Sequence, residues 1–104
     1  MNMPFAEFDM KLMEKINETN DNTAILNYLQ NELYQWELSN RRSEEDLSLS
    51  VSDYLEKSKN NFQESLDIYS DKLNDNPEDE IIIGMHSMYS YYVTKTSELL
   101  EVAK

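Results

Sequence analysis

The residues of this chain whose types and spacing could do chemistry form a column of carboxylates within residues 51–75. They recur at intervals of 3, 8, 3, 4 and 4 residues, with Asn60 in the longest gap. In chain order they are Asp53, Glu56, Glu64, Asp67, Asp71 and Asp75. In a helix this spacing puts the carboxylates on one side, about one turn apart along much of its length. Such an array of negative charge suits the binding of a basic surface.

A solvated helix face is the alternative interpretation of these carboxylates, because runs of charge usually are solvated. Solvated faces normally interleave lysine with glutamate, however, whereas the close pairs here are like-charged. At about 0.2–0.5 kcal/mol per pair, the repulsion destabilises the helix by roughly 1–2 kcal/mol at low salt. Because the chain tolerates this repulsion, we favour a binding role over simple solvation.

Groups for catalysis or metal binding are scarce. His86 is the only histidine and the chain has no cysteine, so neither a pair of histidines nor a thiolate can hold a metal. No glutamate lies three residues before His86, which excludes the di-iron motif of helical bundles. Residues 71–80 are rich in carboxylates but do not combine the acids and the glycine of a calcium loop. We expect no enzymatic activity, no metal and no cofactor.

Three tyrosines near the C-terminus also suggest a binding surface. Tyr89 and Tyr92 share the apolar stripe of their predicted helix, so core packing explains them. Tyr91 points about 120° or more away from most of that stripe and is a candidate for contact with a partner.

The elements that must position these residues are helices. One glycine and two prolines leave few breakers, which favours long helices over the tight hairpins of a sheet. Apolar residues repeat at helical spacing in four segments. We predict helices over residues 4–18, 23–39 and 51–75, and a fourth that starts at Pro77 and carries an apolar stripe from Ile81 to Ala103. We expect this fourth helix to be the most deeply buried.

Short polar segments separate these helices. Asn-Asp-Asn occurs at residues 20–22 and 74–76, each time between two helical patterns. We predict Asn22 or Thr23 as the cap of the second helix and Asn76 as the cap of the fourth, because such side chains accept hydrogen bonds from free backbone N–H groups.

The entry to the third helix is ambiguous. Residues 47–52 alternate between apolar and serine positions, which is typical of a strand. A single strand has no partner to pair with, so we interpret this segment as a helical or extended linker. Ser43 and Ser52 are the two candidate starts. With two helical hairpins, the chain is predicted to be an all-α four-helix bundle, one domain over residues 1–104.

Charge limits the classes of partner. Twenty-one acidic and nine basic residues give a net charge of −12, and residues 44–80 hold twelve of the acids and three of the bases. Direct binding to nucleic acid or to an anionic membrane is disfavoured by repulsion. We see no signal peptide and no apolar run that could span a membrane, and therefore expect a cytoplasmic protein.

The size and helicity are similar to those of the small helical-hairpin proteins of type VII secretion, but their Trp-x-Gly turn is missing, since Glu37 and Leu38 follow Trp36. In overall charge the chain resembles phage-encoded nucleic-acid mimics that inhibit host defence. Neither resemblance assigns a role to a residue.

We therefore expect a non-enzymatic interaction protein that binds, and inhibits, a basic protein through its carboxylate-lined helix, as a mimic of nucleic acid. The alternative is a helical adaptor, immunity protein or secretion partner that binds through an apolar surface. Residues of that surface would be Tyr28, Tyr34, Leu38 or Tyr91. The sequence does not indicate an oligomeric state.

Overall fold

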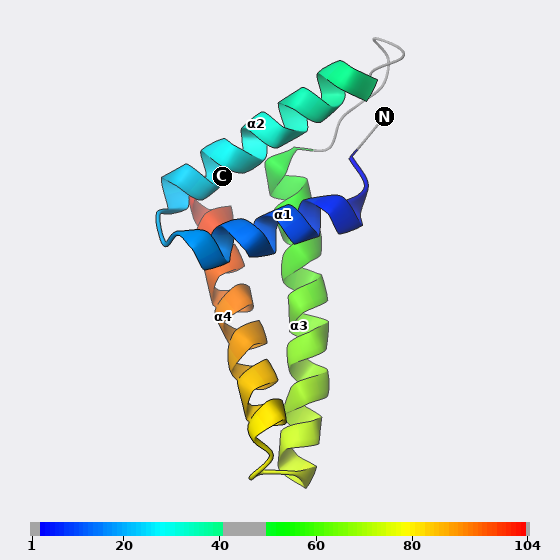
Figure 1. Ribbon diagram of the computed structural model, residues 1–104, viewed down its shortest axis with the longest axis vertical. Coiled ribbons are helices and arrows are strands. Elements are labelled where there is room, and N and C mark those ends of the chain that lie inside the picture. The colour runs from blue at the N-terminus through cyan, green and yellow to red at the C-terminus, as the bar shows by residue number, and fades with distance from the viewer. Residues whose placement is uncertain (1–2, 41–49, 104) are drawn as a thin grey trace.

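The computed structural model describes residues 3–40 and 50–103. Within these ranges 89% of the residues are helical and none lies in a strand (Figure 1). The helices are α1 (Phe5–Glu18), α2 (Asn22–Asn40), α3 (Val51–Asp75) and α4 (Glu80–Ala103). The all-α class and the four helices are confirmed, but α4 begins at Glu80, three residues after the predicted start at Pro77. The side-by-side packing of a four-helix bundle stays a prediction.

The four helices form two hairpins of different length. Helices α3 and α4 make a long antiparallel hairpin, and α1 and α2 lie across one end of it (Figure 1). The molecule is accordingly elongated, with principal extents of 53 × 25 × 21 Å. The half of the α3–α4 hairpin that contains the turn between these helices projects away from α1 and α2 (Figure 1). We call this half, residues 63–91, the distal hairpin.

The core lies where the two hairpins cross. The apolar positions of α1 that share one face, Phe8, Leu12 and Ile16, are all buried. The ring of Phe8 stacks on Tyr54 of α3 with 4.6 Å between centroids. The hydroxyl of Tyr54 donates a hydrogen bond of 2.6 Å to the backbone oxygen of Met3. The N-terminal segment is thereby tied to the start of α3.

Helix α3 begins with a reciprocal cap. The hydroxyl of Ser50 accepts a hydrogen bond from the backbone N–H of Asp53, and the carboxylate of Asp53 accepts one from the backbone N–H of Ser50. This capping box satisfies two N–H groups that the helix cannot satisfy itself. The predicted start at Ser52 is therefore wrong by two residues. Ser43 and residues 47–49 lie outside the described residues, and Val51 and Ser52 are helical.

Two further caps differ from the sequence prediction. Asp21, rather than Asn22 or Thr23, accepts hydrogen bonds from the backbone N–H groups at the start of α2. Asp79, rather than Asn76, does the same for α4, which begins at Glu80. An aspartate in the turn carries two acceptor oxygens and is favoured next to the positive end of the helix dipole.

Asn76 ends α3 instead of starting α4. Its backbone N–H and its side-chain amide both donate to the carbonyl oxygen of Lys72. The turn between α3 and α4 is thus held from both sides. None of the four helices combines the length and the apolar character that a bilayer-spanning segment needs.

Candidate functional site

All six carboxylates of the predicted column are exposed on α3. They lie on the side of the helix opposite to the stripe that packs against α4, where Phe62 meets Tyr92 with 5.1 Å between ring centroids. The structure nevertheless divides the column into three parts with different surroundings.

The first member, Asp53, belongs to the cap of α3. Its carboxylate accepts hydrogen bonds from the backbone N–H and the hydroxyl of Ser50, at 3.0 and 2.9 Å. These hydrogen bonds favour the charged form and lower the pKa of Asp53. Helix capping accounts for this residue without a partner.

The second member, Glu56, lies near the crossing of the hairpins. It lines a shallow hollow of about 460 Å³ between α3 and α4, together with Lys59, Glu98 and Glu101. This neighbourhood of mixed charge separates Glu56 from the rest of the column.

The remaining four carboxylates line the distal hairpin. They are Glu64, Asp67, Asp71 and Asp75. Asp67 accepts a hydrogen bond of 3.0 Å from the side-chain amide of Gln63. No ion pair joins any of the four to another residue that the structure describes. The ammonium group of Lys72 lies 5.2 Å from the ring centroid of Tyr69, beside the column rather than on it.

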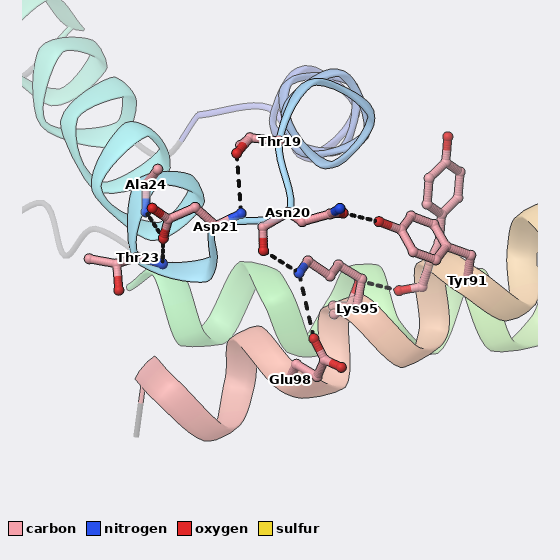
Figure 2. Close-up of polar contacts among 10 residues, drawn as sticks. Thr19, Asn20, Asp21, Thr23, Ala24, Tyr91, Lys95 and Glu98 are labelled. Atoms are coloured by element: carbon pink, nitrogen blue, oxygen red, sulfur yellow. Dashed lines mark hydrogen bonds and ion pairs between the residues drawn. The ribbon is translucent and has the colours of Figure 1, made fainter.

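Tyr91 has an intramolecular role that its sequence position did not reveal. The residue is 42% exposed, but its hydroxyl donates a hydrogen bond of 2.9 Å to the side-chain oxygen of Asn20 (Figure 2). One turn further, the ammonium group of Lys95 donates at 2.8 Å to the backbone oxygen of Asn20 and lies 3.6 Å from Glu98 (Figure 2). Tyr91 and Lys95 together hold the α1–α2 turn on α4.

The residues of the alternative apolar surface lie mainly on α2. Tyr34 and Leu38 are exposed, whereas Tyr28 is half-buried with the ammonium group of Lys15 at 4.8 Å from its ring centroid. Tyr28 is therefore partly used inside the chain, and Tyr34 and Leu38 are available to a partner.

The distal hairpin carries an exposed apolar surface that the sequence pattern did not indicate. No residue from Gln63 to Tyr91 is buried, although this span contains a large share of the apolar side chains of α3 and α4. Ile81, which was predicted to start the buried stripe of α4, is 78% exposed. Ile68 and Ile83 are also exposed. A helical stripe indicates that a face is apolar, but it does not indicate what covers that face.

His86 is half-buried, and one of its ring nitrogens lies 3.2 Å from the hydroxyl of Ser70. This contact joins α4 to α3 within the distal hairpin. In residues 3–40 and 50–103, no cluster of three or more acidic or histidine side chains has the geometry to hold a metal ion.

Comparison of the chain with known protein families, with curated proteins and with solved structures finds no match.

Proposed function

We propose that this protein is a binding module that recognises a basic surface of another protein through the carboxylates of α3. The observation that supports the proposal is the exposed group on the distal hairpin: four carboxylates on one side of a helix, without ion pairs to other described residues. From Glu64 to Asp75 the helix rises by roughly 16 Å, so the charges are about one turn apart. A basic groove whose positive charges are spaced to match these carboxylates would be attracted to all four of them together.

The mechanism of this proposal is occlusion. A protein whose basic groove holds a nucleic acid would meet a similar line of negative charge on α3, and the bound helix would exclude the natural ligand. The chain would act in the cytoplasm as one domain without catalysis, built from two hairpins that form a four-helix bundle where they cross. The role as a nucleic-acid mimic and inhibitor is part of this proposal.

The test reverses charge at the proposed site and compares it with the same change elsewhere. The test variant replaces Glu64, Asp67 and Asp71 by lysine. The control variant replaces Glu14, Glu18 and Glu101 by lysine, and these exposed residues lie on other faces. Both variants change the net charge by the same amount, from −12 to −6. Binding that depends on total charge alone would respond to both, whereas binding that depends on the array would respond only to the first.

Binding is measured by capture of proteins from the lysate of the native host at two salt concentrations. We expect the wild-type protein and the control variant to capture the same basic protein at low salt and to release it as salt rises, because exposed charges are screened within about 10 Å at 0.1 M. The test variant should capture none of it. If the captured protein holds nucleic acid, added DNA or RNA should compete. Equal capture by the two variants would contradict the proposal.

The second candidate function is an adaptor that binds through α2. The observation in its favour is the exposure of Tyr34 and Leu38, at 55% and 59%. A variant with both residues changed to alanine would then lose the partner, and binding would be insensitive to salt with a large negative heat-capacity change. Tyr91 is unsuitable for this test, because its hydroxyl holds Asn20.

A further inference from the structure

We propose that the distal hairpin binds a basic amphipathic helix of the partner protein on the face that continues the surface covered by α1. We call this the docking face and define it by Ile68, Tyr69, Ile81, Met85 and Met88. The inference rests on the proposed function and deepens it, because it names the kind of segment that the acidic helix receives.

The first observation is that the apolar stripe of the α3–α4 hairpin is longer than the surface that α1 and α2 cover. Phe62 and Tyr92 are buried at the crossing, and every residue between Gln63 and Tyr91 is at least partly exposed. The rings of Tyr69 and Tyr89 stack with 5.6 Å between centroids, so the two helices stay packed on each other in this region. The uncovered apolar surface is therefore presented by an ordered hairpin.

The second observation identifies the face of α3. Tyr54 faces α1, because its ring stacks on Phe8. At 100° per residue, Ile68 lies within about 40° of Tyr54 around α3, and Tyr69 lies within about 60° on the side toward α4. The side of α3 that meets α1 near its start therefore exposes Ile68, at 54%, further along the helix.

The third observation identifies the matching face of α4. Tyr92 faces α1, because its hydroxyl accepts a hydrogen bond of 2.9 Å from the side-chain amide of Asn17. Ile81, Met85 and Met88 all lie within about 40° of Tyr92 around α4. Ile68 of α3 and these three residues of α4 are thus placed on the side on which α1 lies, whereas the exposed Ile83 lies on the opposite side of α4.

A helix is the occupant that fits this surface. Helix α1 already packs across the same side of the two helices at the crossing (Figure 1). From Phe62 to Asp75, α3 rises by roughly 20 Å, and packed helices lie 8–10 Å apart, so the docking face has room for at least one more helix beside α1. Methionine and isoleucine side chains suit such a contact, since methionine adapts to irregular surfaces.

The charge of the distal hairpin indicates which kind of helix would bind to the docking face. The distal hairpin contains seven acidic residues and one lysine, a net charge of 1 − 7 = −6 with neutral histidine. Glu64 and Asp71 lie four residues before and three residues after Ile68, so carboxylates flank the apolar contact. A second copy of this chain would place its own distal hairpin, with a charge of −6, against the same charge, so self-association through this face is disfavoured by repulsion. A helix with apolar residues on one face and lysine or arginine along its edges complements both features.

The test uses two synthetic peptides of about 18 residues, or five helical turns. The amphipathic peptide carries leucine at helical spacing on one face and lysine elsewhere. The scrambled peptide has the same composition but distributes leucine around the helix. Charge attraction to the protein is the same for both, so a difference in affinity reports recognition of the apolar face.

The two protein variants change exposed apolar residues that support no core. The test variant is Ile68→Ser with Ile81→Ser on the docking face. The control variant is Ile83→Ser with Val102→Ser, which are also exposed but lie elsewhere. We expect calorimetric titration to show that the wild-type protein and the control variant prefer the amphipathic peptide by tenfold or more. The test variant should bind the two peptides equally.

Each other outcome counts against one of the two proposals. If the wild-type protein binds both peptides equally, or if the test variant keeps the preference, the docking face is wrong while charge recognition stands. If the Glu64, Asp67 and Asp71 lysine variant binds the peptides as well as the wild type does, the proposed function itself fails. A dimer in sedimentation equilibrium that dissociates in the test variant would show that a second copy occupies the face.

Discussion

The position of Asp9 in the fold is unfavourable for a charged carboxylate. It lies half-buried on α1, and one of its oxygens is buried without a hydrogen-bond partner among the described residues. Burial raises the pKa of Asp9, because it disfavours the charged form. The nearby hydroxyl of Ser58 opposes this effect but does not reach hydrogen-bond geometry. At neutral pH the charged carboxylate therefore destabilises the folded chain.

We predict that Asp9→Asn stabilises the protein at neutral pH by roughly 0.5 kcal/mol, a small figure because half of the group still meets water. The sign follows from linkage. A group whose pKa is raised in the folded state makes its full contribution to the free energy of unfolding below its unfolded-state pKa. That contribution is lost as the pH rises through the folded-state pKa. The gain over wild type should therefore shrink as pH falls below about 4, where the carboxyl group is neutral in both states.

Chemical denaturation of Asp9→Asn and wild type across pH 3–7 checks this prediction. The control is Glu14→Gln on the exposed side of the same helix, which should have little effect at any pH. A variant that is less stable than wild type at pH 7 would show that the carboxylate makes a favourable contact.

The sequence predicted the exposure of the six carboxylates correctly, but it could not distinguish their roles. Asp53 lies on the same side of α3 as Asp67, yet it caps the helix through Ser50. The role of Tyr91 depends on Asn20, which precedes it by 71 residues. A periodic pattern along one helix contains no information about such long-range hydrogen bonds.

Among the helices, α4 contains the only glycine of the chain, at a position without an evident use. Gly84 lies inside the helix, and a Cβ atom added there would meet nothing within 4 Å. Glycine in a helix interior is less favourable than alanine by roughly 0.5–1 kcal/mol, because it loses more backbone entropy on folding.

We therefore predict that Gly84→Ala raises the free energy of unfolding by about 0.5–1 kcal/mol. Urea denaturation followed by circular dichroism measures the change. Ser87→Ala, at another exposed position of α4, is the matched control and should have a smaller effect. An unchanged or lower midpoint for Gly84→Ala would mean that the distal hairpin opens separately from the rest of the molecule.

The positions of the helices were predictable, and the residues that cap them were not. Helical periodicity and the polar breaks identified α3 with its observed ends, Val51 and Asp75. The caps were misplaced because several residues of each turn have suitable side chains. Which of them meets a free N–H depends on the path of the turn, as with Asp79 in place of Asn76.

The net charge of the protein should influence its thermal stability. Residues 44–80 carry a net charge of 3 − 12 = −9 out of the −12 of the whole chain, and these like charges repel one another. We predict that the melting temperature rises by several degrees between 10 and 150 mM salt, because the screening length falls from about 30 to 8 Å. Each 1 kcal/mol of relieved repulsion corresponds to roughly 4–8 °C. Thermal melts in sodium chloride measure this, and a flat or falling curve would show that repulsion is unimportant.

The arrangement of the two hairpins could not be predicted from the sequence. The apolar stripes of α3 and α4 extend well beyond the surface that the shorter helices cover, and periodicity alone suggests that all of it is core. Only the structure shows that α1 and α2 cross one end and leave Ile68 and Ile81 exposed.

The hydrogen bonds that hold the α1–α2 turn also set an order of events during synthesis. Asn17 and Asn20 bind Tyr92 and Lys95, residues that follow them by 75 positions. At roughly 5–20 residues per second, a ribosome needs about 4–15 s to make that length of chain. The first two helices therefore leave the ribosome before their binding site exists, with Phe8, Leu12 and Ile16 open to solvent. During those seconds the nascent chain is a potential client for chaperones, and that exposure ends when α3, which carries the Tyr54 ring that stacks on Phe8, and then α4 have emerged.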